Sequence, residues 1–523
     1  MTAACHFSQL NIEFNQTALF PPLSGTLFCQ KNALVGNNGK GKSVLMRMLA
    51  QILTPTSGHI HWNIPFIHVD QLTRLTGNTL IDALGISELY QAFARINAGN
   101  GTLVDFELVE DKWHYPATWQ SLLDSANLPI SMETPIAYLS GGERTRLALC
   151  RAFLHPNHFL LLDEPDNHLD TEGRQWLSEK LAQHTAGSLV ITHNRTLLAH
   201  MQNILELTDK GLHEYGGNYA LYDEQRKFEL AAIEAESERL DKHIRHEKQQ
   251  QQATLQKAAQ RRKQGEKVRS SGSQSLLLLD MKKNRAEKRQ SNVAERHQRV
   301  IGDLHDQLQQ SQDKIIHTKP QKMYLKYQGD GRKVTVFAAD LHLPYGYQAP
   351  LSFTAYSSEH WHIKGHNGSG KSTLLKILAG HIQALSGEYR ISGEFCYLDQ
   401  HLNLLDKSLP VAEALHHYQP AFTVEQWRTQ LGMLRIRGDK SLQPLHLLSG
   451  GEQLKTTLLA LTHSPTPPAV LLLDEPDNHL DLDSKQLLEN LLNEYQGTLF
   501  LVSHDNVFIE QCNITHELNL SNQ

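Results

Sequence analysis

The sequence predicts an α/β protein in which two similar domains are joined by a pair of antiparallel helices. The first observation behind this prediction is an internal repeat, because four motifs occur twice in the same order, roughly 300 residues apart. The second observation is the stretch between the two copies. It is rich in Gln, Lys, Arg, Glu and Ala and contains one proline, Pro320. This composition favours long exposed helices.

Four motifs make up the repeat. They are GNNGKGKSVL at 36–45 and GHNGSGKSTL at 365–374, LSGGERTRLAL at 139–149 and LSGGEQLKTTL at 448–458, LLLDEPDNHLD at 160–170 and at 471–481, and VITHN at 190–194 and LVSHD at 501–505. Coincidence does not produce four motifs twice in one order. The repeat predicts a first domain over residues 1–222, a linker over 223–320 and a second domain over 321–523.

The linker carries apolar residues at helical spacing on both sides of a polar turn. They are Ile233, Leu240 and Ile244 before the turn, and Val300, Leu304 and Leu308 after it. The segment SSGSQS at 270–275 has the composition of a loop. The simplest arrangement is a helical hairpin, with two helices folded back on each other as an antiparallel coiled coil.

Composition excludes several classes of protein. The formal net charge is -6, so any basic surface must be local. The five cysteines are scattered and form no CxxC pair, which indicates reduced thiols in a cytoplasmic protein. The N-terminus lacks the pattern of a signal peptide. No apolar run approaches the roughly 18 residues that cross a bilayer, so we expect no membrane insertion.

Both glycine-rich motifs fit the phosphate-binding pattern G-x-x-x-x-G-K-[ST], and each lies between a strand-like and a helical run. Glycines let the backbone wrap around phosphates, and the exposed N–H groups hold the negative charge. Lys42 and Lys371 would reach the terminal phosphates of ATP, while Ser43 and Ser372 would present a hydroxyl to Mg²⁺. The predicted ATP-binding residues are Gly36, Asn37, Asn38, Gly39, Lys40, Gly41, Lys42, Ser43 and Val44, and Gly365, His366, Asn367, Gly368, Ser369, Gly370, Lys371, Ser372 and Thr373.

Each LLLD run predicts a buried strand that ends in an acid. Asp163 and Asp474 would hold Mg²⁺, mostly through water, because Mg²⁺ keeps part of its hydration shell. The following Glu164 and Glu475 are placed to orient or deprotonate the attacking water. These four residues predict ATP hydrolysis.

Two histidines, His193 and His504, end the next apolar runs. A single histidine at a strand end is usually structural. Duplication at the same position of the repeat favours contact with the γ-phosphate and a catalytic role.

In both halves LSGGE follows a GxxxxGKS loop and precedes LLLDEP. This order of motifs resembles that of the ABC ATPases, and the resemblance covers nearly the entire chain. The resemblance implies two P-loop NTPase domains of the ABC type, with Gln71 and Gln400 touching Mg²⁺. It also implies that each half closes over ATP held by the other through Ser140, Gly141 and Gly142, and through Ser449, Gly450 and Gly451. Asp170 and Asp481 would cross that interface. Phe14 and Tyr345 are candidates for stacking on adenine, with core packing as the alternative.

Three further features resemble those of the ABC-F family. They are EPxNHLD in both halves, GLHEYGGNYALYDEQR at 211–226 and the long charged linker. This resemblance implies a cytoplasmic monomer whose partner is the ribosome, with the linker near rRNA and peptidyl-tRNA. Its role would be translation regulation or antibiotic resistance. The alternatives are a DNA-structure-binding ATPase and the ATPase subunit of a transporter.

The linker tip is basic on both sides of its turn. It carries Arg261, Arg262, Lys263, Lys267 and Arg269, and then Lys282, Lys283, Arg285, Lys288 and Arg289. No aromatic residue lies between Phe228 and Tyr324, which favours contact with phosphates and RNA shape over base stacking. A solvated spacer hairpin is the alternative. The apolar run Leu276–Leu279 is unusual for a spacer.

Two departures from the family pattern and one difference between the two halves stand out. Asp166 and Asp477 replace the usual Thr, which would either raise the pKa of the neighbouring glutamate or be a neutral surface change. Asn194 replaces an acid and leaves open whether the first site hydrolyses ATP as the second does. The first half is about twenty residues longer somewhere within 72–138. These extra residues would form either a surface loop or a small protruding contact element.

Overall fold

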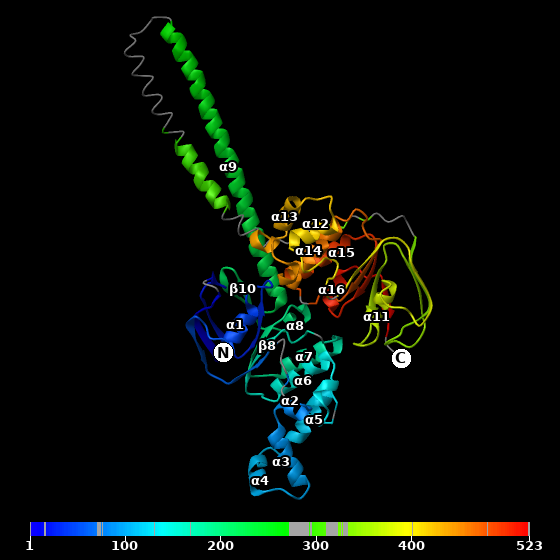
Figure 1. The fold of residues 1–523 in the computed structure, drawn as a ribbon. Coiled ribbons are helices and arrows are strands. Elements are labelled where there is room, and N and C mark those ends of the chain that lie inside the picture. The colour runs from blue at the N-terminus through cyan, green and yellow to red at the C-terminus, as the bar shows by residue number, and fades with distance from the viewer. Residues whose placement is uncertain are drawn as a thin grey trace. The chain divides into compact units, whose positions relative to one another are not determined.

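The computed structural model describes residues 2–14, 17–70, 75, 77–129, 131–167, 169–270, 292, 295–309, 323–325, 327, 333–399, 401–478 and 480–520. The chain divides into two compact units. One combines Met1–Tyr222 with Gln321–Gln523, and the other is Asp223–Pro320. Figure 1 shows the elements of both units.

Two central sheets form the framework of the first unit. The first has the order β11-β10-β5-β9-β8-β7 and the second has the order β19-β14-β18-β17-β16. Their strands are β5 (Lys31–Val35), β7 (Phe66–Val69), β8 (Phe159–Asp163), β9 (Ser188–Ile191), β10 (Asn203–Thr208) and β11 (Gly211–Gly216), then β14 (His360–Lys364), β16 (Phe395–Leu398), β17 (Val470–Asp474), β18 (Thr498–Val502) and β19 (His516–Asn519). Apart from the antiparallel β11, the strands are parallel and the two orders correspond. This confirms the predicted pair of α/β domains.

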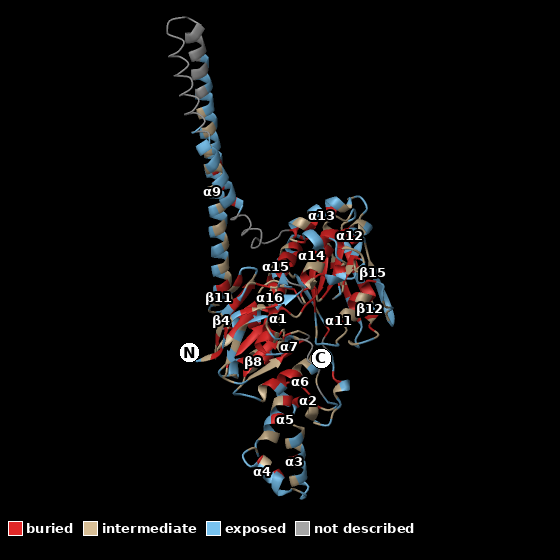
Figure 2. Cartoon of the chain, turned by 60° about the vertical axis from the view of Figure 1, so that its left-hand side comes forward, coloured by how far each residue is buried: buried red, intermediate tan, exposed pale blue. Residues whose placement is uncertain are grey.

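Strands β8 and β17 lie inside these sheets because their sequences are apolar without alternation. All five residues of each strand are buried. Continuous apolar runs are typical of parallel strands that are covered on both faces. Figure 2 shows the buried residues concentrated in the sheets and in the helices against them. The acid that ends each strand therefore emerges at a fixed edge of a rigid sheet.

An antiparallel three-stranded sheet accompanies each central sheet. The orders are β4-β1-β6 and β13-β12-β15. The strands are β1 (Ala3–Asn11), β4 (Leu23–Phe28) and β6 (Ser57–Trp62), and β12 (Val334–His342), β13 (Leu351–Tyr356) and β15 (Ser386–Ile391), with a small hairpin of β2 (Glu13–Phe14) and β3 (Thr17–Ala18) in the first half. The equivalent sheets extend the repeat beyond the four motifs.

The helices that follow the repeated motifs also correspond. They are α1 (Lys42–Leu49), α6 (Gly141–Phe153), α7 (Thr171–Gln183) and α8 (Arg195–Ala199), and α11 (Lys371–Leu378), α14 (Gly450–Thr462), α15 (Leu482–Glu494) and α16 (Asn506–Gln511). Ser140 and Ser449 begin α6 and α14 with reciprocal capping boxes, in which Glu143 and Glu452 return the bond. The LSGGE sequence thus builds the same helix start twice.

The halves differ in their helical parts. The first has α2 (Leu80–Leu84), α3 (Ser87–Asn97), α4 (Leu103–Val109), α5 (Tyr115–Ser125) and the short turn η1 (Ile136–Tyr138), and the second has α12 (Val411–Tyr418), α13 (Val424–Met433), η2 (Gly438–Ser441) and η3 (Leu445–Leu447). Helices α3 to α5 enclose a small core of Ala92, Phe93, Val109 and Trp119. The extra residues of the first half therefore form a packed helical element, and the surface-loop alternative is wrong.

The second unit is a helical hairpin where it is described. Helix α9 (Tyr219–Ser270) begins in the first unit, and residues 295–309 are helical again. Ile244, Leu304 and Leu308 are buried against one another. Glu247 Oε2 lies 3.0 Å from His297 Nδ1. These contacts confirm the predicted antiparallel pair. The turn, Leu276–Leu279 and the basic residues after them lie outside the described residues.

Candidate functional site

The two phosphate loops share positive φ angles at two glycines each. Gly39 and Gly41 have φ angles of 79° and 91°, and Gly368 and Gly370 have φ angles of 81° and 96°. Residues other than glycine rarely adopt these angles. The loops therefore curl tightly between a strand and the first N–H groups of a helix, which is the geometry that holds phosphates.

The loop lysines point back into these loops. Lys42 Nζ donates to the carbonyl oxygens of Gly36 (2.7 Å) and Asn37 (3.3 Å). Lys371 Nζ donates to those of Gly365 (2.8 Å) and His366 (2.9 Å). Burial lowers the pKa of both ammonium groups, and nearby carboxylates oppose that shift. A phosphate chain in the loop would place negative charge next to each buried ammonium group and so stabilise its charged form.

The acids that end β8 and β17 fit a divalent cation. Ser372 Oγ donates to Asp474 Oδ1 (2.9 Å), and the Tyr397 hydroxyl donates to Oδ2 (3.3 Å). Within the described residues, both oxygens of Asp163 are buried without a hydrogen-bond partner. Burial raises the pKa of Asp163 to about 6, and the nearby Ser43 hydroxyl opposes this shift. A buried carboxylate beside a hydroxyl is a donor set that Mg²⁺ accepts, with water completing its shell.

Glu164 and Glu475 have an unusual backbone. Their φ angles are 49° and 50°, in the left-handed region that glutamate rarely adopts. The N–H of Glu164 donates to Ile191 O (2.9 Å), and the N–H of Glu475 donates to Val502 O (2.9 Å). Backbone strain of this kind persists where the surrounding structure imposes it, and it concentrates at functional sites.

An asparagine holds the side chain of each of these glutamates. Asn167 Nδ2 donates to Glu164 Oε2 (2.7 Å), and Asn478 Nδ2 donates to Glu475 Oε2. Our sequence prediction missed both asparagines, although they belong to the repeated EPDNHLD. Their duplication in this motif was the signal that could have identified them.

The pKa of Glu475 is raised by burial, and then by the negative charges of Asp474 and Asp477. Asp477 is itself buried, and so is Asp166, which accepts a hydrogen bond from Thr192 Oγ1 (2.9 Å). The alternative of a neutral surface change is therefore wrong for both aspartates. For the second half, the structure supports the predicted like-charge effect on the glutamate.

The two candidate histidines lie at the ends of β9 and β18. His504 Nε2 is 3.8 Å from Glu475 Oε1. Burial lowers the pKa of His504 to about 3, and burial also lowers the pKa of His193. Both rings are neutral at pH 7, so each has one N–H to donate and one nitrogen that accepts.

One contact joins the phosphate loop of the first half to the second half. The backbone N–H of Asn38 donates to Asp481 Oδ2 (3.0 Å). Asp481 also caps α15 through the N–H of Ser484 (2.9 Å). On the other side, His366 Nδ1 lies 3.9 Å from Glu172 Oε1. The acid expected to cross between the halves does so at Asp481.

The remaining predicted residues are placed unequally. Gln71 and Gln400 lie outside the described residues. Phe14 and Tyr345 are 50% and 72% exposed, so the core-packing alternative is wrong for both. The loop after Tyr345 touches the second phosphate loop, because the Tyr347 N–H donates to Ser369 O (2.9 Å). The backbone at Tyr345 therefore lies against the second phosphate loop.

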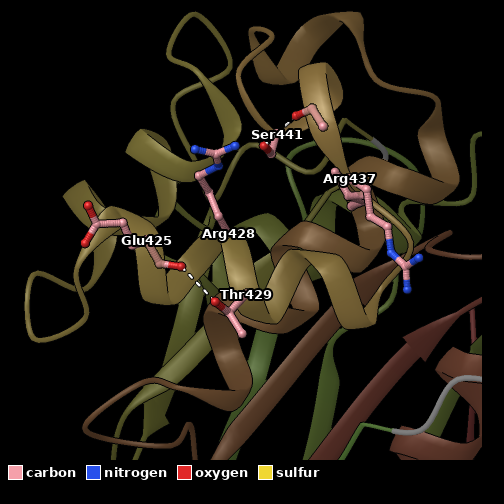
Figure 3. A pocket seen from close by; sticks show the side chains of 7 residues that line it. Glu425, Arg428, Thr429, Arg437 and Ser441 are labelled. Carbon is pink, nitrogen blue, oxygen red and sulfur yellow. Dashed lines mark hydrogen bonds between the residues drawn. The ribbon is translucent and has the colours of Figure 1, made fainter.

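A separate hollow of about 290 Å³ lies between α13 and η2 in the second half (Figure 3). Thr429 Oγ1 donates to the Glu425 carbonyl (3.0 Å) and fixes one wall, while Arg428 and Arg437 also line it. None of the repeated motifs contributes to it. This hollow is therefore distinct from the candidate ATP sites.

Three comparisons place these features among known proteins. The family model described as "ABC transporter" matches residues 29–167 and 349–478. "Probable ATP-binding protein YheS" of Haemophilus influenzae is 32% identical over 526 residues, which cover 95% of this chain and 76% of that protein. "ATP-binding protein Uup" of the same organism is 29% identical (91% and 72% covered), and "Uncharacterized ABC transporter ATP-binding protein YfmM" of Bacillus subtilis is 28% identical (94% and 93% covered).

Solved structures share the fold. A complex of the archaeal ribosomal stalk protein aP1 with the archaeal ribosome recycling factor aABCE1 matches with a TM-score of 0.53 and 17% identity, over 96% of this chain and 86% of that chain. A structure titled "RNase-L Inhibitor" matches with a TM-score of 0.52, 17% identity and the same coverage. Within the described residues, we find no helix long and apolar enough to span a bilayer.

Proposed function

The chain belongs to the ABC-F family of ATPases, and we propose that it holds two ATP molecules with Mg²⁺ between its halves and uses their closure to act on the ribosome. ATP binding and hydrolysis follow from the family. The proposed domains are residues 1–222 and 321–523, with the linker over 223–320. The observation that carries the proposal is the hydrogen bond from Asn38 to Asp481, which joins one phosphate loop to the opposite half.

Each ATP site combines residues from both halves. In the first site the phosphates lie in the loop 36–43 and LSGGE comes from 448–452. In the second site the loop is 365–372 and LSGGE comes from 139–143. Ser43, Asp163 and Gln71 in the first site, and Ser372, Asp474 and Gln400 in the second, would hold Mg²⁺, which would supply positive charge to the phosphate oxygens.

Glu164 and Glu475 orient and deprotonate the attacking water. The asparagine amide holds one oxygen of each carboxylate and so fixes the orientation of the carboxylate toward that water. Neutral His193 and His504 donate an N–H to the γ-phosphate, because a neutral imidazole stabilises developing negative charge without needing a counterion. Strained backbones hold the two glutamates in place during the reaction.

The ribosome is the partner that the linker supports best. Its tip concentrates lysine and arginine on a chain whose net charge is -6, and such local charge favours a phosphate backbone. A structural neighbour is titled as a ribosome recycling factor. The place of action is the cytoplasm, and the result is regulation of translation or protection from an antibiotic.

Co-sedimentation tests the proposal. Glu164→Gln and Glu475→Gln together should trap the closed, ATP-bound protein, which should then pellet with 70S ribosomes in ATP and not in ADP. The matched control is Glu179→Gln with Glu494→Gln, the same chemical change at exposed positions of α7 and α15. ATP-dependent closure without ribosome binding would contradict the ribosome role, and preferential binding to branched DNA would favour the DNA alternative.

A further inference from the structure

Beside each proposed ATP site, α7 and α8 meet α15 and α16, and we call this contact region the edge of the site. The two edges differ in their side chains. The repeat defines the counterparts there: Arg174 corresponds to Lys485, Ser178 to Glu489, Asn194 to Asp505, Arg195 to Asn506 and Leu197 to Phe508. Equal halves would give two equal edges. These five pairs differ in charge or size, so the edges differ.

One edge is filled by ion pairs. Arg195 Nη1 lies 2.6 Å from Glu489 Oε1, and the two side chains are only 12% and 7% exposed. Lys485 Nζ donates to Asp505 Oδ2 (2.8 Å), and this pair is also buried. Phe508 donates its N–H to Asp505 Oδ1 (3.2 Å), and its side chain is fully buried. The Arg195–Glu489 pair thus joins α8 to α15, and the Lys485–Asp505 pair joins α15 to the start of α16.

The counterpart edge is hollow. A cavity of about 260 Å³ is lined by Arg174, Ser178, Asn194, Leu197 and Asn506, which are the counterparts of the residues that fill the other edge. Ser178 is smaller than glutamate, Asn506 is smaller than arginine and Leu197 is smaller than phenylalanine. The hollow exists because these side chains are short. We refer to it as the Arg174 hollow.

The Arg174 hollow opens beside the proposed chemistry of the second site. His504 lines it, and the same ring is 3.8 Å from Glu475. Hydrolysis adds water to the γ-phosphorus and breaks its bond to the bridging oxygen, which leaves ADP, inorganic phosphate and a proton. The phosphate is formed next to His504, so the hollow adjoins the place where this product appears.

The lining of the hollow suits an oxyanion. Arg174 Nε is buried and, among the described residues, has no hydrogen-bond partner. Thr171, Gln175, Asn194 and Asn506 add polar side chains. The acid in the lining, Asp166, accepts a bond from Thr192 Oγ1 (2.9 Å). Asn194 stands where the other edge has Asp505, so this edge has one carboxylate fewer to repel phosphate.

We propose that the Arg174 hollow is the exit path for inorganic phosphate from the second ATP site, and that the Arg195–Glu489 ion pair closes the equivalent path from the first. This inference rests on the proposed roles of Glu475 and His504. Product phosphate passes from His504 to Arg174 and leaves between α7 and α16. Phosphate from the first site waits until the halves separate.

A variant that fills the hollow tests the exit path. Ser178→Glu with Asn506→Arg rebuilds on this edge the ion pair found on the other. It is made in a Glu164→Gln background, so that the second site alone supplies phosphate. Cleavage is followed by acid quench and release by a fluorescent phosphate-binding protein, in a single turnover. We expect unchanged cleavage and at least about tenfold slower release, which corresponds to about 1.4 kcal/mol on the release barrier.

Release that keeps pace with cleavage in the filled variant would overturn the exit path. Absence of cleavage in the Glu164→Gln parent would instead overturn the proposed role of Glu475. The mirror variant, Arg195→Asn with Glu489→Ser in a Glu475→Gln background, removes both charges together and so leaves neither unpaired. It should accelerate release from the first site, and an unchanged rate there would overturn the blocking role of the ion pair.

Discussion

At the scale of residues, Asp477 places a second carboxyl group close to the proposed base of the second site. The pKa of Glu475 is raised by burial and then by Asp474 and Asp477. A base with a raised pKa is protonated, and inactive, over a wider range of acidic pH. Asp477 thus narrows the pH range over which the second site hydrolyses ATP. Within that range it makes Glu475 a stronger base.

Asp477→Asn should therefore move the acidic limb of the pH–rate profile to lower pH. Removing the negative charge lowers the pKa of Glu475, so the glutamate stays ionised, and active, at more acidic pH. The measurement is kcat against pH in a Glu164→Gln background, which isolates the second site. Glu494→Gln, at an exposed position of α15, is the control and should leave the limb in place. A limb that moves to higher pH, or does not move, contradicts the effect assigned to Asp477.

Sequence patterns predicted those residues whose role depends on local backbone. Gly39, Gly41 and their counterparts are required by a loop between a strand and a helix, and that context is visible in the sequence. The Arg195–Glu489 pair was not predictable, because its members lie 294 residues apart and neither belongs to a repeated motif. The burial of Asp166 and Asp477 also depends on packing between distant segments.

At the scale of elements, the hairpin of the linker has a small core. Apolar spacing predicted Ile244 against Leu304 and Leu308, and these residues are buried together. The packed helices α3 to α5 were not predicted, because a length difference between two halves locates extra residues without giving their structure. Within the described part of the hairpin few residues are buried, so these contacts contribute much of its stability there.

Leu304→Ala should loosen the hairpin and leave the ATP sites intact. Truncating a buried leucine costs about 2–5 kcal/mol, and here the loss falls on a separate unit. Hydrogen exchange should increase in residues 240–250 and 295–309, while basal ATP hydrolysis is unchanged. Leu255→Ala, on an exposed face of α9, is the control and should change neither. Equal exchange in both variants would contradict the hairpin core.

At the scale of the whole molecule, the two halves share a fold but not the same environment for their catalytic groups. Asp474 accepts hydrogen bonds from Ser372 and Tyr397 in the second half. Tyr397 corresponds to His68 in the first half, whose Nε2 is buried without a hydrogen-bond partner among the described residues. The buried Lys485–Asp505 pair supports the loop after His504, whereas its counterparts in the first half are Arg174 and Asn194.

These differences predict that the second site hydrolyses ATP faster. Glu475→Gln should therefore remove well over half of the steady-state ATPase activity, whereas Glu164→Gln should remove less than half. The reason is that Tyr397 gives the metal-binding acid of the second site a hydrogen bond that His68 does not supply in the first, and that the second site adjoins the Arg174 hollow. The measurement is the rate of phosphate production by the two single variants. Nucleotide binding is measured in parallel, to confirm that both loops remain occupied. Equal losses would mean that the differences around Asp474, Lys485 and Asn194 affect stability without affecting turnover.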